Sequence, residues 1–284
     1  CILSRNKDRV GAGSPAPQAA APVANIQNTP DQPFSFVVPT EFVELPSNGL
    51  FYSVGHPLHN QTTIEIKQMT AKEEDILTSR SLLKQGVAID RVLQSIVIDK
   101  SIDIASLLIG DKNALVIASR VSGYGNVYTT NVTCPNCETK QEYSFDLNLA
   151  EVTNGGTAES VTSNGDGTFF ITLPNSGLNV RFKLLNGYDE KRISNTSTTK
   201  GNKPDNLITT QIRAMLVSVN DQSDPETLNY VAQNLPSRDS AFLRKAYKES
   251  APNINIDQHF SCGNCEFEDT MEVPLTADFF WPDR

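Results

Sequence analysis

Four cysteines stand in two CxxC pairs, and their spacing is typical of metal-binding thiolates. The first pair is Cys134 and Cys137, and the second is Cys262 and Cys265. Tetrahedral zinc accepts four sulfur ligands, and two CxxC turns together supply four. A zinc ion enclosed by four sulfurs has no open position for a substrate or a reactive water. The pairs therefore predict a structural zinc site without catalytic chemistry.

Residues of strand character flank both pairs. They cover 126–133 and 140–147 around the first pair, and 255–261 and 267–273 around the second. This pattern predicts two short hairpins, each with a tight turn that directs two sulfurs to one point. The pairs are separated by the 124 residues 138–261, whereas a compact zinc finger has about 15 to 20. We therefore expect a discontinuous, zinc-ribbon-like pair of hairpins that joins distant parts of the chain.

Reduced or cross-paired cysteines are the alternative to a zinc site. A two-residue gap is unfavourable for a disulfide within a pair. A thioredoxin-type redox motif needs a CxxC that opens a helix, and no helical pattern follows either pair. His259 could replace a sulfur or support the metal, although an ordinary strand position is the simpler interpretation. His56 and His59 are expected to be exposed or hydrogen-bonded, and Cys1 to be a free thiol.

Composition argues against several functional classes. The 284 residues include 24 Lys plus Arg and 33 Asp plus Glu, giving a net charge of −9 and a pI near 4.9. There is no basic stripe, so nucleic acid is a disfavoured partner. No apolar run approaches the ~18 residues of a membrane span, and no GxSxG, Walker, HExxH or Rossmann motif occurs. We expect no membrane partner, no small-molecule substrate and no enzymatic activity. The cysteine usage suits a reducing compartment, so we expect a soluble protein made in the cytoplasm.

Five segments are expected along the chain. Residues 1–33 form a flexible tail rich in Pro and Ala, 34–125 an N-terminal strand and helical region, and 126–149 the first CxxC hairpin. Residues 150–253 form an inserted hairpin and helical region, and 254–284 the second CxxC hairpin with an aromatic C-terminal tail. Helices followed by small antiparallel sheets predict the α+β class.

Helix patterns and capping residues define the predicted helices. The helices are expected at residues 70–86, 87–97, 104–108, 112–122, 189–195, 207–219, 225–233 and 238–250, and a loop at 196–205. Thr70 and Glu73 form a capping box for the first helix, whose acidic first turn is expected to be solvated. Asp111 is predicted to cap the helix at 112–122, and Ser237 or Asp239 the helix at 238–250.

Three consecutive aromatic residues lie near the end of the sequence. Phe279, Phe280 and Trp281 either pack into the core as a final clasp or anchor a neighbouring subunit, and the sequence leaves both open. We keep all three as candidate partner-binding residues.

Several short strings resemble the tail baseplate hub proteins of T4-like contractile-tailed phages. They lie at residues 46–52, 66–78 and 107–114, while 235–239 and 277–282 resemble the longer, CxxC-bearing members of that family. The resemblance covers residues 40 to 284, and none of the strings is a catalytic signature. The short members lack the cysteine pairs, so the zinc site is expected to belong to this branch.

The resemblance implies a non-enzymatic structural or assembly subunit of a phage tail baseplate hub. Its partners would be other tail baseplate or hub proteins, and its place the virion tail after synthesis in the host cytoplasm. Whether it stays in the finished virion or acts only during assembly is left open. The alternative, motivated by the paired CxxC alone, is a zinc-ribbon nucleic-acid-binding protein or transcription adaptor, and a metal-dependent hydrolase would need an open coordination position.

Overall fold

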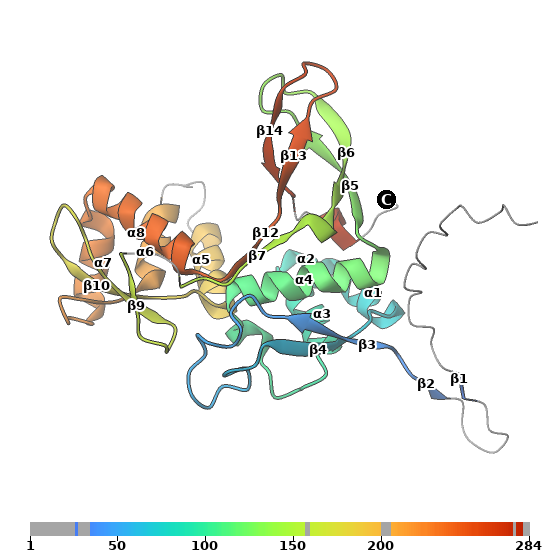
Figure 1. Ribbon diagram of the computed structural model, residues 1–284, viewed down its shortest axis with the longest axis horizontal. Helices are drawn as coiled ribbons and strands as arrows, with labels where there is room; N and C mark the ends of the chain where they lie inside the picture. The colour runs from blue at the N-terminus through green and yellow to red at the C-terminus, as the bar shows by residue number, and fades with distance from the viewer. Residues whose placement is uncertain (1–25, 28–34, 157–159, 200–205, 275–276, 281–284) are drawn as a thin grey trace, which may run out of the picture. The chain divides into compact units, whose positions relative to one another are not determined.

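The chain divides into a small N-terminal unit, Cys1–Pro39, and a larger unit, Thr40–Arg284. The computed structural model describes residues 26–27, 35–156, 160–199, 206–274 and 277–280 (Figure 1). In the first unit, β1 (Ile26–Gln27) pairs antiparallel with β2 (Ser35–Phe36). The tail predicted for residues 1–33 lies outside the described residues apart from β1, and so does Cys1.

The larger unit begins with a strand pair and a set of helices. Its first elements are β3 (Thr40–Glu44), β4 (Thr63–Lys67), α1 (Ala71–Thr78), α2 (Arg80–Lys84), α3 (Ala88–Ile96), the 3-10 turn η1 (Ile104–Ser106) and α4 (Ile109–Tyr124). β3 and β4 pair antiparallel, with buried Val43 opposite buried Ile64. In α3, the buried Val92, Leu93 and Ile96 form one apolar face. α4 contacts both β3 and α3 (Figure 1), so these elements share one core.

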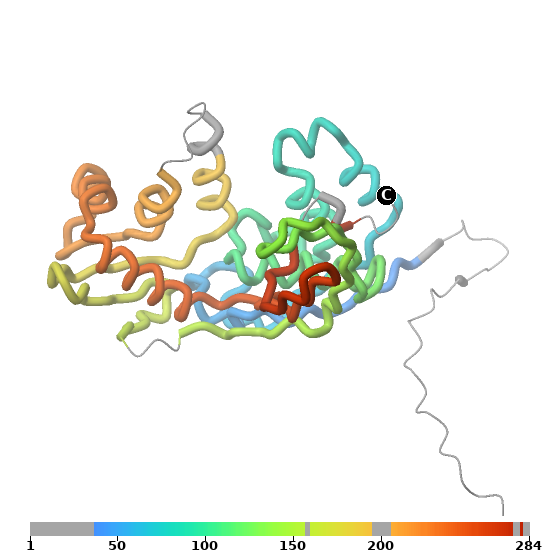
Figure 2. Tube along the Cα trace, turned by 90° about the horizontal axis from the view of Figure 1, so that it is seen from above, coloured from blue at the N-terminus to red at the C-terminus, as the bar shows by residue number. Residues whose placement is uncertain are grey.

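The two predicted CxxC hairpins are confirmed as antiparallel pairs. β5 (Val127–Thr133) pairs with β6 (Lys140–Asp146), and β13 (Asp257–Ser261) pairs with β14 (Glu268–Glu272). The 3-10 turns η2 (Leu147–Leu149) and η3 (Ala277–Phe280) follow β6 and β14. Figure 1 shows the two hairpins side by side, and the view from above shows their green and red segments together (Figure 2).

The region between the hairpins contains a sheet and helices of its own. The sheet order is β11-β10-β9-β8, formed by β8 (Thr162–Ser163), β9 (Thr168–Thr172), β10 (Asn179–Lys183) and β11 (Leu216–Val219). The helices are α5 (Gly187–Thr199), α6 (Leu207–Met215), α7 (Pro225–Asn234) and α8 (Ser237–Ser250). β7 (Glu151–Thr153) pairs with β12 (Asn253–Asn255) where the chain enters and leaves this region. Helices with several small antiparallel sheets confirm the predicted α+β class.

Several predicted elements differ in extent. The helix predicted at 104–108 is the 3-10 turn η1, and the helix predicted at 112–122 begins earlier, at Ile109. The helix predicted at 207–219 ends at Met215, because Leu216–Val219 pairs with β10 and buries both of its end residues. Sheet pairing here outweighs the helical pattern. The helix predicted at 70–86 is interrupted at Ser79, whose extended backbone separates α1 from α2. The predicted loop at 196–205 starts as the last turn of α5, and its residues 200–205 lie outside the described part of the chain.

Asp111 is a buried residue inside α4 and not its cap, which corrects the prediction. Leu108 occupies the N-cap position. The Asp111 carboxylate accepts hydrogen bonds from the backbone N–H of Ser47 at 2.9 Å, from the Ser47 hydroxyl at 2.6 Å and from the Tyr52 hydroxyl at 2.7 Å. Burial raises the pKa of Asp111 above its ordinary value. The residue therefore ties the loop after β3 to the start of α4.

Asp239 likewise has a tertiary role, because Pro236 is the N-cap of α8. The buried Asp239 carboxylate accepts the backbone N–H groups of Asn175 at 2.8 Å and Ser176 at 2.9 Å. These N–H groups belong to the turn between β9 and β10. The carboxylate thus fixes the β9–β10 turn to the first turn of α8.

Glu73 is the exception to the prediction that the acidic first turn of α1 is solvated, since Lys72, Glu74 and Asp75 are exposed as expected. Its side chain is fully buried and completes the predicted capping box, accepting the Thr70 backbone N–H at 2.9 Å. It also accepts the Ser95 hydroxyl at 2.5 Å and the Lys67 ammonium at 2.9 Å. Burial alone would raise the pKa of Glu73, but the hydrogen bonds from Ser95, Thr70 and Lys67 outweigh it and lower the pKa to about 2.

Candidate metal centre

The structure brings the four cysteines of the two CxxC pairs together. Their sulfur atoms all lie within 4.8 Å of one another. The closest contacts join the two hairpins, with 3.8 Å from Cys134 Sγ to Cys265 Sγ and 3.7 Å from Cys137 Sγ to Cys262 Sγ. Four Zn–S bonds of about 2.3 Å in a tetrahedron place the sulfurs about 3.8 Å apart. The four cysteines are free thiols, and their geometry fits a single tetrahedral metal ion.

Both cysteine turns have the same backbone conformation. The N–H of Cys134 donates to the carbonyl oxygen of Thr139 at 3.0 Å, and the N–H of Cys262 donates to that of Phe267 at 2.8 Å. The residue after each second cysteine, Glu138 or Glu266, has a positive φ of 57° or 54°. This left-handed conformation is uncommon for a residue with a side chain, so it indicates a backbone held firmly by its surroundings. Each turn thereby points its two sulfurs to the same side.

The two turns make reciprocal contacts through equivalent asparagines. Asn136 and Asn264 occupy the same place within their pairs. The side-chain amide of Asn136 lies 3.6 Å from the sulfur of Cys265, and that of Asn264 lies 3.7 Å from the sulfur of Cys137. Each hairpin therefore donates an amide to a sulfur of the other hairpin. N–H donors at this distance favour the thiolate form that binds a metal.

Side-chain hydrogen bonds hold the hairpins together next to the sulfurs. Gln141 of β6 accepts the backbone N–H of Gly263 at 3.0 Å and donates its amide to the carbonyl oxygen of Ser261 at 3.2 Å. The Tyr143 hydroxyl donates to the carbonyl oxygen of His259 at 3.0 Å. These bonds fix the position of one CxxC turn relative to the other, independently of the metal.

Further from the sulfurs, an aromatic cluster and a second amide close the space between the hairpins. The ring of Tyr143 packs on those of Phe145 and Phe260, at centroid distances of 5.0 Å and 5.2 Å. The Gln258 side chain accepts the Asp146 N–H at 3.1 Å and donates to the Asp146 carbonyl oxygen at 2.7 Å. Phe145 and Phe260 are buried, so the hairpins share a small apolar core.

The sulfur atoms differ in their electrostatic surroundings. Hydrogen bonding to Thr139 lowers the pKa of Cys137 to about 6, and the N–H of Asn264 helps to lower the pKa of Cys262. At Cys265, the hydrogen bond from Asn136 favours the thiolate. Hydrogen bonding with the sulfurs of Cys137 and Cys262 nevertheless raises the pKa of Cys265 to about 11. Four sulfurs so close together cannot all carry negative charge without a cation. A divalent metal would supply that charge.

The histidines considered as ligands lie elsewhere. His259 is an exposed residue of β13. His56 contacts the Ser106 hydroxyl at 2.9 Å, and His59 contacts the Tyr52 carbonyl oxygen at 2.7 Å. Among the residues that the structure describes, the four cysteines are the one group of His, Cys, Asp and Glu side chains placed to share a metal ion.

The aromatic residues near the C-terminus are placed next to the first hairpin. Phe279 and Phe280 are buried within this chain, and the Phe279 ring meets the Tyr128 ring at 5.0 Å. In this conformation their surfaces are not available to a neighbouring subunit. Trp281, the third candidate for partner binding, lies outside the described residues.

Sequence reasoning missed Arg120, which anchors this C-terminal segment. The fully buried guanidinium donates to the carbonyl oxygens of Phe279 at 2.7 Å, Gly125 at 2.7 Å and Val127 at 3.2 Å. It therefore joins α4, the start of β5 and η3. A lone arginine in an apolar helix is the signal that could have identified it, because a buried arginine needs partners. The repeated Asn-Cys-Glu triplet is the corresponding signal for Asn136 and Asn264.

Comparison with known proteins identifies a family. Comparisons with curated proteins and with solved structures find no match. Within the described residues, no helix combines the length and the apolar character needed to span a membrane. The sequence model of one family, described as T4 bacteriophage base plate protein, matches residues 39–281. The match extends over both hairpins and all four clustered cysteines, so this chain belongs to the T4 bacteriophage base plate protein family.

Proposed function

We propose that this chain is a non-enzymatic structural or assembly subunit of a phage tail baseplate hub, stabilised by a structural zinc ion. The observation that carries the baseplate role is the family match over residues 39–281. Membership indicates a structural role in the virion tail, with other tail proteins as neighbours. The assignment to the hub rests on the resemblance of short strings such as 46–52 and 66–78 to hub proteins.

The zinc ion would be held by Cys134, Cys137, Cys262 and Cys265. Soft thiolate ligands in a tetrahedral arrangement favour zinc over magnesium, calcium or manganese, which prefer oxygen. Bound zinc would supply a cross-link and no reaction, because four protein ligands leave no open position. In this proposal residues 150–253 are an insertion between the two halves of the zinc ribbon.

The charges around the hairpins disfavour the nucleic-acid alternative. Their exposed side chains include Glu138, Glu142, Glu266 and Glu268, against one exposed lysine, Lys140. Phosphate backbones are bound by basic surfaces, and these carboxylates would repel them. A salt-dependent mobility shift with DNA or RNA would support the alternative. Absence of a shift at low salt would remove it.

The hub assignment is tested with isolated phage tails. An affinity-tagged copy of the chain, produced during infection, is expected to co-sediment with baseplates and to give density at the central hub in a cryo-electron map. Density at the baseplate periphery would overturn the hub assignment but keep the family role. Detection in assembly intermediates and absence from finished tails would establish a role in assembly only.

The zinc assignment is tested on the purified chain. Mass spectrometry under native conditions is expected to find one zinc ion per chain. Cobalt substitution is expected to give the absorption spectrum of tetrahedral four-sulfur coordination. A spectrum that requires a water or histidine ligand would contradict the four-cysteine site and reopen the hydrolase alternative.

A further inference from the structure

Two short contacts between sulfurs join one CxxC hairpin to the other. Cys134 Sγ lies 3.8 Å from Cys265 Sγ, and Cys137 Sγ lies 3.7 Å from Cys262 Sγ. Cys134 and Cys262 are buried, whereas Cys137 and Cys265 are half-buried. Each contact therefore combines a sulfur that a small reagent can reach with a sulfur that is shielded from solvent.

Hydrogen bonds that involve no sulfur hold these contacts in place. Gln141, Tyr143 and Gln258 each bond to the backbone of the opposite hairpin. The facing sulfurs are therefore kept opposite one another without the help of a metal. A disulfide has an S–S distance of about 2.05 Å, so each sulfur has to move by about 0.9 Å. A small rotation about its Cα–Cβ bond provides this movement.

We infer that the cysteine cluster is a redox switch, in which a peroxide releases the zinc ion and leaves two disulfides between the hairpins, Cys134–Cys265 and Cys137–Cys262. The inference deepens the proposed function and rests on its zinc site. Virion surfaces are oxidising, whereas the cytoplasm is reducing. A cross-link held by the metal during synthesis would thus be replaced by a covalent one in the finished particle.

The half-buried sulfurs react first, because the peroxide reaches them. The Cys137 thiolate attacks one oxygen of hydrogen peroxide, so an S–O bond forms, the O–O bond breaks and hydroxide leaves, which gives a sulfenic acid. The Cys262 thiolate then attacks this sulfur, forms the S–S bond and displaces a second hydroxide. Cys265 and Cys134 react in the same way. Four thiolates and two peroxide molecules thus give two disulfides and four hydroxide ions, with four electrons passed from sulfur to oxygen and Zn²⁺ set free.

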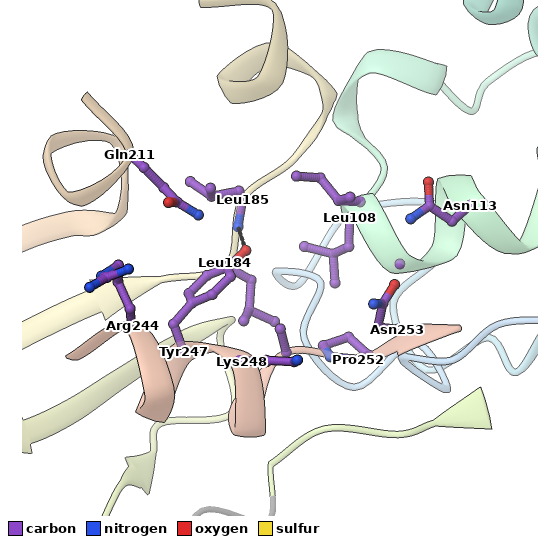
Figure 3. Close-up of a pocket in the computed structure, with 13 residues that line it drawn as sticks. Leu108, Asn113, Leu184, Leu185, Gln211, Arg244, Tyr247, Lys248, Pro252 and Asn253 are labelled. Carbon is purple, nitrogen blue, oxygen red and sulfur yellow. Dashed lines mark hydrogen bonds between the residues drawn. The ribbon is translucent and has the colours of Figure 1, made fainter. Parts of the chain in front are cut away.

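A covalent link between the hairpins has a consequence for the region 150–253, which they enclose. Where this region meets α4, the packing leaves a cavity of about 390 Å³ (Figure 3). Leu108 and Asn113 border the cavity from the start of α4, and Leu185 and Tyr247 border it from the enclosed region. This contact is therefore incompletely packed. The disulfides would close a loop that contains the 124 residues between the pairs, and such a cross-link stabilises a fold by restricting the unfolded chain.

Peroxide titration of the purified, zinc-loaded full chain tests the inference. All chains carry Cys1→Ser, so the four clustered cysteines are the only thiols. Two equivalents of hydrogen peroxide are expected to release all of the zinc to a chromophoric chelator. After free thiols are blocked, an unreduced tryptic digest should contain the peptide 121–140 joined to the peptide that starts at Glu249. Fragmentation of the backbone between Cys134 and Cys137 should then assign Cys134 to Cys265 and Cys137 to Cys262.

Two matched double variants test the role of the half-buried sulfurs. Each lacks one cysteine of each hairpin, so both lose the four-sulfur site to the same degree. Cys137→Ser with Cys262→Ser leaves the contact between Cys134 and Cys265, and peroxide should join its two peptides completely. Cys137→Ser with Cys265→Ser leaves only the two buried sulfurs, and its peptides should stay separate at the same dose of peroxide.

The outcomes distinguish a failure of the inference from a failure of the proposed zinc site. Four results would overturn the inference and leave the zinc site intact: zinc that stays bound in excess peroxide, disulfides within each CxxC pair, sulfinic acids in place of disulfides, or equal joining in both double variants. A purified chain that cannot be loaded with zinc would contradict the zinc site itself, and the inference with it.

Discussion

The repeated Asn-Cys-Glu triplet shows how individual residues shape the candidate metal centre. In each triplet the glutamate adopts a left-handed backbone, the cysteine presents its sulfur, and the asparagine amide reaches a sulfur of the other hairpin. No single residue of this set is diagnostic. The chemistry arises because two copies of the triplet face each other across a distance of less than 5 Å between sulfurs.

Replacing Cys134 and Cys137 with serine should remove the metal and the protease resistance of the C-terminal region. Structural zinc contributes on the order of 10 kcal/mol of apparent binding free energy, comparable to the whole stability of a domain. Metal analysis should fall from one zinc per chain to none, and limited proteolysis should cut between residues 254 and 274. Cys1→Ser is the control, because this cysteine is outside the two pairs. Retained metal in the double variant would contradict the site.

Replacing Asn264 with alanine should weaken zinc binding without abolishing it. The side-chain amide of Asn264 lies close to the Cys137 sulfur and donates to Thr139 at 3.1 Å, so its loss removes support for the thiolate. Loss of such an outer contact typically costs about 10-fold to 100-fold in metal affinity. Competition with a chromophoric chelator measures this difference. Asn131→Ala, an exposed position of the first hairpin, should leave the affinity unchanged.

Glu73 should give the chain a specific dependence of stability on acid. Its folded-state pKa of about 2 lies below the ordinary value of 4.5, so its contribution is complete above about pH 4.5 and is lost as the pH falls towards 2. Glu73→Gln should lower the free energy of unfolding by roughly 3 kcal/mol at pH 7, and the gap should close in acid. Urea unfolding between pH 7 and 2 measures it. A gap for Glu73→Gln that stays constant from pH 7 to 2 would refute the assignment.

At the scale of elements, α4 depends on a close contact with the segment that leaves α8. A Cβ atom built on Gly110 would lie 2.0 Å from the carbonyl oxygen of Pro252 and 2.8 Å from Asn253 Cα. Because both neighbours are backbone atoms, they cannot move aside separately. Gly110 therefore allows α4 and β12 to approach one another, and it couples the helical part of the larger unit to the strand that leads into the second hairpin.

Gly110→Ala should destabilise the chain by about 3 kcal/mol through overpacking. Gly123→Ala is the matched control, since it lies in the same helix and its Cβ would meet the flexible end of Met69 at 2.9 Å. That side chain can move, so the control should cost less than about 1 kcal/mol. Thermal unfolding of both variants checks the difference. Equal destabilisation would show that the α4–β12 contact is not tight.

Elements with a local signal could be predicted, and elements set by distant contacts could not. The hairpins follow from alternating residues around each CxxC, and the capping box of Thr70 and Glu73 follows from a four-residue pattern. Asp111 carries the same local signal as a helix cap, yet its partners Ser47 and Tyr52 lie 59 or more residues earlier. Asp239 also carries the local signal of a helix cap, yet its partners Asn175 and Ser176 lie in the distant turn between β9 and β10. Capping chemistry and tertiary anchoring use the same carboxylate hydrogen bonds, and a sequence does not distinguish them.

The candidate metal site was predictable in composition but not in detail. The four cysteines follow from spacing alone, because a CxxC pair predisposes two sulfurs to one side of a turn. Their amide donors and the bridging Gln141 depend on how one hairpin faces the other, and that arrangement is set by packing. Arg120 is a similar case, since its three acceptors come from separate segments of the chain.

On the scale of the whole molecule, the buried core belongs to the larger unit. Among the described residues, buried apolar side chains begin at Val43 and end at Phe280. The first hairpin and the second hairpin are far apart in sequence but share one small core and the cysteine cluster. Contacts between the two hairpins therefore join the middle of the chain to its C-terminal part. The region between the hairpins begins and ends at this junction.

A chain that lacks residues 1–39 should keep its fold and its metal. The boundary between the two units lies after Pro39, and the described core begins only at Val43. Removal should therefore leave the zinc content unchanged and shift the melting temperature by less than a few degrees, as circular dichroism and metal analysis can measure. Incorporation into tails should decrease, because a composition rich in Pro and Ala is typical of segments that bind partners. Unchanged incorporation would place the partner contacts in the larger unit alone, and a large loss of stability would mean that the first unit contributes to the core after all.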